Sequence, residues 1–535
     1  MLSGCVPWPP DLAQSYRAAG YWRGETLAGL LRAVALSDGG RTAVVTRHDR
    51  VTYAALDHRV DRLAAGLRRL GIGRRDRVIV QLPNTVDFVA VCVALFRVGA
   101  IPVLTLAAHR RAEIGYLSDH AEATALVVPD VHLGFDHRQL AREVRSLVPT
   151  LKHVLVAGEP DEFIGLADVA DEPRDLPPPD PADVALCLLS GGTTGAPKII
   201  PRTHDDYAYQ MRETARAMRL DQSGAYLAAL PAAHNAALGC PGVLGALLVG
   251  AKAVLAASPA PDEVFPLIGA ERVTLTTLMP AFLPLWMDSV DLFDVDLSRL
   301  VVEVGGAVLT PDLARQVDPA LGCTLTRWFG MAEGLLCYTR IDDPAEVRFT
   351  TDGRPLCAAD EIRIVDGDGV DVPVGATGEL LTRGPYTVRG YYRADDYNSR
   401  TFTPDGFYRT GDLVRMREDG NIIVEGRIKD VVNRGGEKVS AAEVEEHLRA
   451  HPAVRDAAVV AMPDPMLGEK SCAFVVAAAG PADAAPTLGE LREFLSGRGL
   501  AEFKLPDRLV LTDDLPHTAV GKVHKAALLR GLGDI

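Results

Sequence analysis

An apolar run at Val184–Leu188 leads directly into a loop of small, hydroxyl-bearing and charged residues, Ser190–Lys198. The loop contains three glycines, three hydroxyl groups and one lysine. Glycines let a backbone approach a ligand closely, and N–H groups, hydroxyls and a lysine can together bind phosphate oxygens. Pro197 stands where a Walker A loop requires glycine, and no dinucleotide-binding glycine fingerprint occurs. The pattern predicts either a buried strand that ends in another type of phosphate-binding loop, or a flexible surface turn.

Helical and apolar strand patterns alternate before and after this loop. Leu56–Leu70 has the spacing of an amphipathic helix, and Arg77–Gln81 that of a buried strand. A helix at Ala90–Val98 and a strand at Ile101–Leu106 follow. Strands separated by helices form parallel sheets that are covered on both faces. Because 535 residues are too many for one ordinary hydrophobic core, we expect an α/β protein with two or more domains.

Short strands and turns replace that alternation after Cys337. A smaller unit begins near Gly426 and carries its own helices and strands. The expected strands are Glu361–Val365, Gly378–Thr382, Asn421–Glu425, Val454–Ala461 and Cys472–Ala477, and the expected helices are Ala441–Arg449 and Leu488–Leu495. The predicted fold is a large N-terminal domain of several subdomains, with helix-covered parallel sheets and a β-rich part, followed by a small α+β C-terminal domain.

Charge and cysteine usage exclude several classes of function. The net charge is −15, so no basic field attracts a nucleic acid or an anionic membrane. A phosphate ligand would therefore be held by local cations and a metal ion. The eight cysteines form no C-x-x-C pair, which disfavours a zinc site or a redox pair. The N-terminus lacks the pattern of a signal peptide, and Lys252 interrupts the apolar stretch Val243–Ala257. We expect a cytoplasmic protein that binds neither nucleic acid nor membrane.

Eight short segments have to be explained together. They are Ser190–Lys198, His234-Asn235, Gly305–Ala307, Phe329–Glu333, Gly378–Leu380, Tyr408–Asp412, Gly426–Asp430 and Pro516–Lys522. In number, order and spacing they resemble the adenylate-forming superfamily, which includes acyl-CoA synthetases, peptide-synthetase adenylation domains and firefly luciferase. The resemblance covers essentially the whole chain, from about Leu30 to Leu529. It implies an adenylation core at residues 1–426, a hinge at 427–430, and a mobile C-terminal domain at 431–535 that carries a catalytic lysine.

The chemistry of that family joins a carboxylate to the α-phosphate of ATP. Two unit charges 4 Å apart interact by about 4 kcal/mol at an effective dielectric constant near 20, so repulsion between the anions must be offset. The resemblance implies that Glu333 binds Mg²⁺ and that Lys522 bridges the substrate carboxylate and the α-phosphate. Viewed alone, Glu333 is also consistent with a solvated loop acid, and Lys522 with a solvent-exposed tail lysine.

The nucleotide contacts implied by the resemblance come from five segments. Lys198 with Thr193 and Thr194 would cradle the β- and γ-phosphates, Asp412 would accept the ribose hydroxyls with Arg427 nearby, and Gly305 with Gly306 and Ala307 would leave a flat slot for adenine. The complete set of implied ATP-binding residues is Ser190, Gly191, Gly192, Thr193, Thr194, Gly195, Lys198, Gly305, Gly306, Ala307, Phe329, Gly330, Met331, Ala332, Asp412 and Arg427. An aspartate in a turn is the alternative reading of Asp412.

The resemblance also implies two arrangements of the domains. The C-terminal domain closes in one orientation for adenylation, then rotates about Lys429 so that the adenylate meets a thiol. Lys522 would then leave the site, while Gly436 and Lys438 would line the tunnel of the thiol. An ordinary charged linker between domains is the alternative for residues 427–430.

The acid must be inferred from the pocket. Amino-acid-activating relatives usually place an aspartate where this chain has Asn235, and a neutral amide would leave a substrate ammonium uncompensated. The segments around Asn235 and Glu333 resemble stand-alone aryl-acid ligases of siderophore and related natural-product pathways, which activate 2,3-dihydroxybenzoate or salicylate. Cys240 and Leu336 are similar to the salicylate type. The substrate contacts expected are His234, Asn235, Ala236, Cys240, Gly306, Ala332, Leu336, Cys337 and Lys522.

His234 would act as a gate between the ATP and acyl sites, or serve only as a structural histidine. Ala236 and Cys337 replace the aromatic residue and the asparagine that are common at these positions in the family. These replacements open space, so we expect tolerance of ring substituents, as in 6-methylsalicylate or 3-hydroxyanthranilate.

Three functions remain distinct at this point. The first is an aryl acid–AMP ligase that passes its product to the phosphopantetheine arm of a separate aryl carrier protein, with salicylate-type acids preferred over 2,3-dihydroxybenzoate. The second is an aryl-CoA ligase with the same first half-reaction. The third is a nucleotide-binding pseudoenzyme, which the presence of both Glu333 and Lys522 disfavours.

Overall fold

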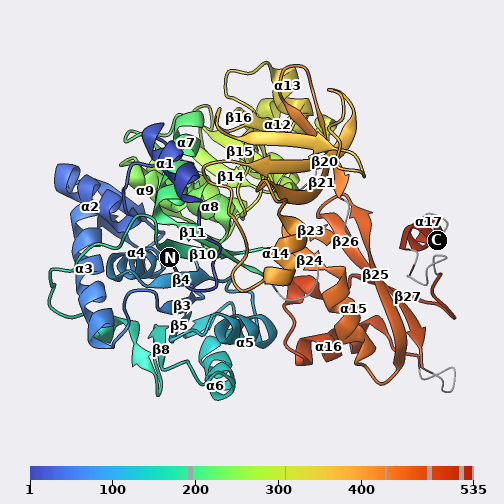
Figure 1. The fold of residues 1–535 in the computed structure, drawn as a ribbon, viewed down its shortest axis with the longest axis horizontal. Helices are drawn as coiled ribbons and strands as arrows, with labels where there is room; N and C mark the ends of the chain where they lie inside the picture. Colours follow the sequence, from blue (N-terminus) through green and yellow to red (C-terminus); the bar gives the residue numbers. More distant parts are fainter. Residues whose placement is uncertain are drawn as a thin grey trace.

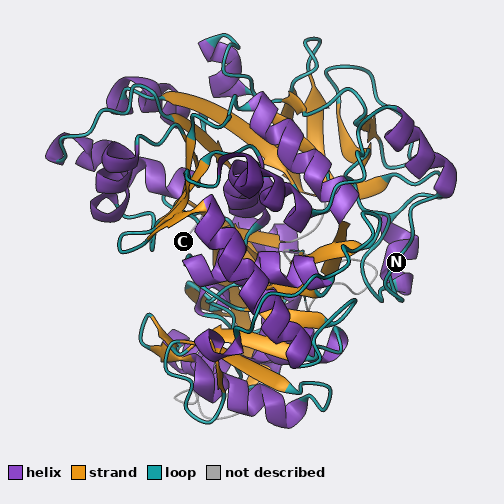
Figure 2. Cartoon of the chain, turned by 90° about the vertical axis from the view of Figure 1, so that its left-hand side faces the viewer, coloured by secondary structure: helices purple, strands orange, loops and turns teal. Residues whose placement is uncertain are grey.

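The computed structural model describes residues 1–190, 197–307, 309–427, 431–478, 485–516, 523 and 525–532. A large N-terminal part and a small C-terminal part lie side by side (Figure 1). Both mix helices with strands (Figure 2), and the predicted α/β class is confirmed. No helix in the described part of the chain is long and apolar enough to cross a membrane.

The first sheet has seven strands, and it is parallel except for its β10–β11 pair. Its order is β11 (Ile199–Thr203), β10 (Val184–Leu189), β4 (Ile101–Leu104), β3 (Arg77–Val80), β5 (Ala125–Pro129), β8 (His153–Ala157) and β9 (Ile164–Gly165). Val78 and Val80 face the core that contains α3 (Tyr53–Arg69) and α4 (Val86–Val98), whereas Ile79 faces α5 (Arg111–His120) and α6 (His137–Leu147). This alternation explains why the strand is apolar throughout.

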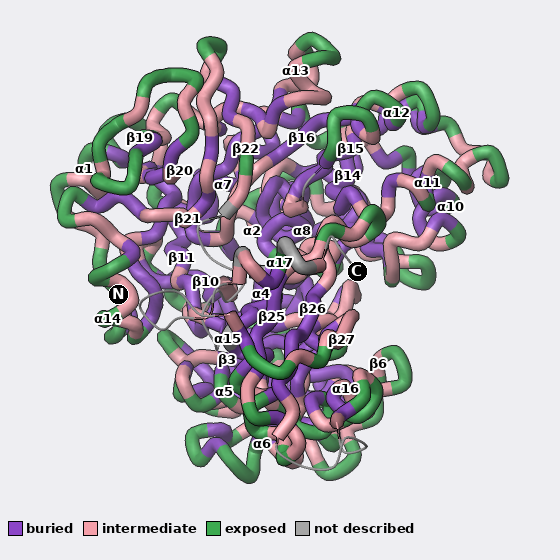
Figure 3. The backbone as a smooth tube through the Cα atoms, turned by 90° about the vertical axis from the view of Figure 1, so that its right-hand side faces the viewer, coloured by how far each residue is buried: buried purple, intermediate pink, exposed green. Residues whose placement is uncertain are grey.

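The second sheet has nine strands in the order β18 (Arg354–Pro355), β17 (Leu336–Tyr338), β16 (Thr324–Gly330), β15 (Val301–Gly305), β14 (Leu275–Leu278), β12 (Ala225–Ala228), β13 (Lys252–Leu255), β1 (Thr42–Val45) and β2 (Arg50–Thr52). One face packs on α10 (Pro261–Glu271), α11 (Leu283–Ser289) and α12 (Pro311–Leu321). The other packs on α7 (His204–Ala217), α8 (Asn235–Gly239) and α9 (Gly242–Leu248), in the core shared with the first sheet. Buried backbone follows the central strands, and exposed backbone the outer loops (Figure 3).

A four-stranded antiparallel sheet forms the β-rich part that the sequence predicts. Its strands are β19 (Glu361–Val365), β20 (Thr377–Arg383), β21 (Tyr408–Met416) and β22 (Ile422–Arg427). Smaller elements complete the N-terminal part. They are α1 (Pro10–Ala18), α2 (Leu27–Asp38), β6 (Val131–His132), β7 (Phe135–Asp136), α13 (Ala345–Thr350) and α14 (Asp395–Thr401).

The C-terminal part has a five-stranded sheet of its own. The strands are β24 (Glu437–Ser440), β23 (Val431–Arg434), β26 (Gly468–Ala477), β25 (Val454–Asp464) and β27 (Arg508–Leu511). The helices are α15 (Ala441–Arg449), α16 (Leu488–Gly497) and α17 (Lys525–Leu532). The β23–β24 hairpin faces the N-terminal part, whereas α17 lies on the far side of the sheet (Figure 1).

Candidate active site

A cavity of about 750 Å³ lies between the two parts of the chain. Most of the site residues expected from the sequence and described by the structure line it. They are Ser190, Lys198, His234, Asn235, Ala236, Cys240, Gly306, Ala307, Phe329, Gly330, Met331, Ala332, Glu333, Leu336, Asp412, Gly436 and Lys438. Residues far apart in the sequence therefore meet in one space.

Several expected site residues fall outside the described part of the chain. These are Gly191, Gly192, Thr193, Thr194, Gly195, Lys429 and Lys522, together with the side chain of Arg427. The two ends of the predicted phosphate loop are described. The backbone N–H of Ser190 donates to the carbonyl of Lys198 at 2.9 Å, and the N–H of Lys198 donates to Ser190 Oγ at 3.1 Å. Lys198 Nζ lies 4.0 Å from the ring centre of Tyr397.

Cys337 requires a correction, because it does not line the cavity. Alternation along β17 turns Leu336 towards the cavity and Cys337 towards the β-rich part, where it is fully buried with Leu380 and Val414. Its effect on a substrate ring would be indirect. Gly305 also lies behind the cavity wall, since an added Cβ would stand 2.5 Å from the indole of Trp328.

Glu333 follows β16, and its carboxylate accepts a hydrogen bond from one phenol that a second phenol contacts in turn. Tyr391 Oη donates to Glu333 Oε1 at 2.6 Å, and Tyr408 Oη lies 3.0 Å from Tyr391 Oη. Glu333 remains 7% exposed, at the cavity wall. A carboxylate suits the hard Mg²⁺ ion, which takes one or two protein carboxylates and completes its shell with phosphate and water. Among the described residues, no group of three or more His, Cys, Asp or Glu side chains is arranged to hold a metal ion.

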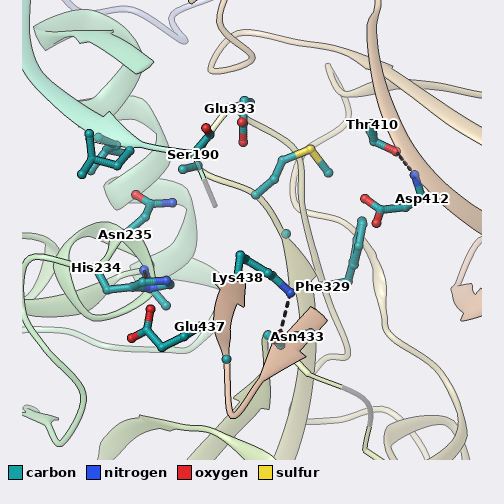
Figure 4. A pocket seen from close by; sticks show the side chains of 18 of the residues that line it. Ser190, His234, Asn235, Phe329, Glu333, Thr410, Asp412, Asn433, Glu437 and Lys438 are labelled. Carbon is teal, nitrogen blue, oxygen red and sulfur yellow. Dashed lines mark hydrogen bonds between the residues drawn. The ribbon is translucent and has the colours of Figure 1, made fainter. Parts of the chain in front are cut away.

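The expected ribose and adenine contacts form one end of the cavity. Asp412, on β21, is 3% exposed, and its backbone N–H donates to Thr410 Oγ1 at 3.0 Å (Figure 4). Arg427 pairs with Asp412 across the β21–β22 ladder, so its backbone lies where the sequence places it. Gly306 has a φ of +77°, a left-handed conformation that favours glycine.

The small domain supplies a further wall of the cavity, which contacts Gly306 directly. Asn433 Nδ2 donates to the carbonyl of Gly306 at 2.6 Å, and Lys438 Nζ donates to the same oxygen at 3.2 Å. Asn433, Glu437 and Lys438 approach the cavity from the β23–β24 hairpin (Figure 4). Burial raises the pKa of Glu437 to about 7, although Lys438 and Lys504 lower it. This wall brings an acid and an amine close to His234.

His234 and Asn235, which the sequence predicts at the acyl site, both line the cavity. His234 precedes α8, and its Nδ1 accepts the backbone N–H of Ala236 at 3.4 Å. Desolvation and the positive charge of Lys438 lower the pKa of His234 to about 4, so the imidazole is neutral at pH 7. The neighbouring wall contains Ala236, Cys240 and Leu336. No ionised group among these residues could compensate an ammonium on the substrate.

Sequence reasoning missed two clusters of buried polar side chains near the cavity, one around Arg202 and one around Lys504. Arg202 and Gln210 are both fully buried next to Asn235. Lys504 of the small domain is 4% exposed, and its Nζ lies 3.2 Å from Glu113 of α5 and 2.9 Å from Glu443 of α15. In a sequence, isolated charged residues of this kind look like surface residues, and only the fold shows that they are buried.

Comparisons with known proteins agree with this geometry. Residues 31–392 match the family model described as AMP-binding enzyme, and residues 443–522 match the AMP-binding enzyme C-terminal domain. The chain is 52% identical to the 2,3-dihydroxybenzoate-AMP ligase of Bacillus subtilis, over 100% of this chain and 98% of that protein. It is 50% identical to the salicyl-AMP ligase / salicyl-S-ArCP synthetase of Mycobacterium tuberculosis, over 99% and 95% of the two chains. The apo structure of MbtA from Mycobacterium smegmatis aligns with a TM-score of 0.76 and 49% identity, covering 99% of each chain.

Proposed function

Because the chain belongs to the AMP-binding enzyme family, we propose that it is an aryl acid–AMP ligase. It joins an aryl carboxylate to the α-phosphate of ATP, releases pyrophosphate, and then transfers the acyl group to a thiol. One observation carries the proposal: a single cavity joins Asp412 and Glu333 to a region around Asn235 whose lining side chains Ala236, Cys240 and Leu336 are uncharged.

The side chains of this protein act by neutralising charge and by positioning the reacting groups. Mg²⁺, bound by Glu333 and the phosphates, would withdraw charge from the phosphate oxygens. Tyr391 holds the Glu333 carboxylate in place at 2.6 Å. Lys198 neutralises the outer phosphates, and Asp412 accepts the ribose hydroxyls. Lys522 stabilises the negative charge that develops as the carboxylate attacks. The neutral His234 separates the two ends of the cavity without adding a charge beside the anhydride.

The second step uses the wall supplied by the small domain. Its docking on Gly306 places Gly436 and Lys438 at the cavity, which supports the proposed role of this hairpin in lining a thiol tunnel. The rotation about Lys429 exchanges this wall for Lys522. The acceptor we propose is the phosphopantetheine arm of a separate carrier protein, with coenzyme A as the alternative.

The acid we propose is of the salicylate type. Cys240 is a weak hydrogen-bond partner, and Leu336 fills the space that a second hydroxyl would need. Relatives of nearly equal identity are named for 2,3-dihydroxybenzoate and for salicylate, so the distinction rests on these two side chains. Ala236 leaves room for a further ring substituent.

ATP–pyrophosphate exchange with a panel of substituted benzoates tests the proposal. We expect exchange with salicylate-type acids, and a loss of about a hundredfold or more in Lys522→Ala, as for removal of a group that stabilises transition-state charge. The variant should keep the wild-type melting temperature. Absence of exchange with every ring acid would contradict the proposed activity, and a strong preference for 2,3-dihydroxybenzoate would contradict the proposed acid. Thioester formation with a carrier protein and with coenzyme A then identifies the acceptor.

A further inference from the structure

A chain of buried hydrogen bonds runs from Arg202, on β11, to the acyl end of the cavity. Arg202 Nη2 donates to Gln210 Oε1 at 2.9 Å, and Gln210 Nε2 donates to the carbonyl of Gly239 at 2.9 Å. A guanidinium can only donate, and a carbonyl oxygen can only accept. The amide of Gln210 therefore has its direction fixed at both ends, with its nitrogen towards α8.

The next amide in the chain is that of Asn235. Tyr207 Oη donates to Asn235 Oδ1 at 2.9 Å, and Gln210 Nε2 faces the same oxygen at 3.5 Å. Turning the Asn235 amide would place its N–H₂ against the N–H₂ of Gln210. Asn235 consequently directs its oxygen into the protein and its nitrogen into the cavity, as Figure 4 shows.

Arg202 is anchored independently of this chain. Its Nε donates to Asp206 Oδ1 at 2.7 Å, and its Nη1 donates to the carbonyl of Ala332 at 3.0 Å. Arg202 is fully buried and Asp206 is 1% exposed, so solvent does not compete for these bonds. The same guanidinium thus contacts the backbone next to Glu333 and orients the side chain that orients Asn235.

We propose that Arg202 and Gln210 are positioning residues that fix Asn235 as a hydrogen-bond donor, so that the site selects aryl acids whose substituent beside the carboxyl group accepts a hydrogen bond. This inference rests on the proposed function. A hydroxyl or phenolate oxygen meets the requirement, whereas an aromatic amine is chiefly a donor. Two opposed donors in a buried site cost about 1–3 kcal/mol, or roughly tenfold to a hundredfold in selectivity. The site therefore favours 2-hydroxybenzoates over 2-aminobenzoates, and this inference replaces the tolerance of 3-hydroxyanthranilate that the sequence led us to expect.

Gln210→Glu tests the direction of the chain. The substitution replaces the donating nitrogen with an acceptor while Arg202 still holds the other oxygen, and it gives up the hydrogen bond to the carbonyl of Gly239. Asn235 then turns to donate to the new oxygen and presents its own oxygen to the cavity. In pyrophosphate exchange, we expect the ratio of kcat/KM for salicylate to that for anthranilate to fall at least tenfold. A residue with a merely structural role would lower both values by the same factor and leave the ratio unchanged.

Two further variants keep the test decisive. Gln210→Met introduces no charge, and removes the donor without supplying an acceptor, so the ratio should fall by a smaller factor. Gln222→Glu makes the same chemical change at an exposed glutamine and should leave the ratio at the wild-type value. An unchanged ratio in both Gln210 variants would overturn the inference while the proposed function stands. A wild-type chain that supports exchange with no ring acid would refute the function, and this inference with it.

Discussion

The acyl end of the cavity and the wall supplied by the small domain are built in different ways. Arg202 and Gln210 are fully buried and bonded within the N-terminal part, so the Asn235 amide, which we propose contacts the substrate, is oriented before any ligand arrives. Asn433 and Lys438 are half-buried and reach across to a single carbonyl, that of Gly306. If the small domain moved away from Gly306, water would hydrate these polar side chains, so breaking the contact would cost little free energy. Under the proposed function, substrate choice would reside in the buried network of the N-terminal part, and the change of half-reaction in the movable wall of the small domain.

Reversing the charge of Lys438, on the cavity wall supplied by the small domain, should have the largest effect on transfer to the thiol. Lys438→Glu removes a charge-assisted hydrogen bond and sets a carboxylate against the carbonyl of Gly306 and beside Glu437. A loss of about 3 kcal/mol of docking free energy corresponds to roughly a hundredfold. We expect single-turnover transfer from preformed aryl-adenylate to a thiol to slow by that factor, while pyrophosphate exchange stays within about twofold.

Lys470→Glu is the matched control for that variant, since Lys470 pairs with Asp464 at the surface of the same domain, where ion pairs contribute little. Equal loss of exchange and transfer in Lys438→Glu would show that the wall serves both steps, and the contrast between the two regions would disappear.

The buried contact between Lys504 and Glu113 should have an intermediate effect. It joins the two parts at 3.2 Å, and Glu113 Oε1 also accepts the backbone N–H of Ala501 at 3.3 Å. Glu113→Gln removes the charge but keeps the size and one acceptor oxygen. Losing about 1.4 kcal/mol of docking free energy lowers the population with the small domain docked about tenfold. We therefore expect tenfold slower transfer to the thiol, with normal pyrophosphate exchange.

The charge states of Glu113 and Lys504 predict that the transfer deficit of Glu113→Gln does not change with pH near neutrality. Burial favours a raised pKa for Glu113, but interactions with Lys504 and His109 outweigh it and lower the pKa of this carboxyl. Burial favours a lowered pKa for Lys504, but the carboxylates of Glu113 and Glu443 outweigh it and raise the pKa of this amine. The depressed carboxyl pKa means that the contact weakens only as pH falls into the acid range, and the raised amine pKa means that it weakens only in strong alkali. Glu437, whose pKa burial raises to about 7 and which interacts with Lys504, titrates in both proteins. The deficit of Glu113→Gln relative to the wild type should therefore be equal at pH 6.5 and pH 8.5. A deficit that changes between these values would exclude the ion pair as its cause.

The regular elements were largely predictable from the sequence because they bury periodic apolar faces. The helix at Ala441–Arg449 has the bounds that its pattern predicts, and β3 and β4 each end within two residues of prediction. The glycine- and acid-bearing motifs also located a substantial part of the cavity wall. These signals are local, so one sequence suffices to read them.

The rest depends on tertiary packing. Nothing in the local pattern distinguishes the buried Arg202 from a surface arginine, and the direction of the Asn235 amide follows from residues 25 and 28 positions away. Cys337 was misassigned to the pocket because the strand register, which alternates the faces of Leu336 and Cys337, is set by pairing with Phe329 and Gly330. Such information is carried by the fold and not by a motif.

A change on the rigid side, Cys240→Ser, should have the smallest effect and sharpen the comparison. Cys240 Sγ lies 3.4 Å from Gln210 Nε2 and faces the cavity. A hydroxyl adds a stronger hydrogen-bond partner near the position where a second ring hydroxyl would lie, and one neutral hydrogen bond contributes about 0.5–1.5 kcal/mol. This free energy corresponds to a rise of about three- to tenfold in the kcat/KM for 2,3-dihydroxybenzoate relative to that for salicylate. We expect transfer to the thiol to be unchanged. Cys240→Ala, which removes the sulfur and adds no polar group, should leave the preference for salicylate intact. If both variants alter transfer as strongly as adenylation, substrate choice is not confined to the rigid region.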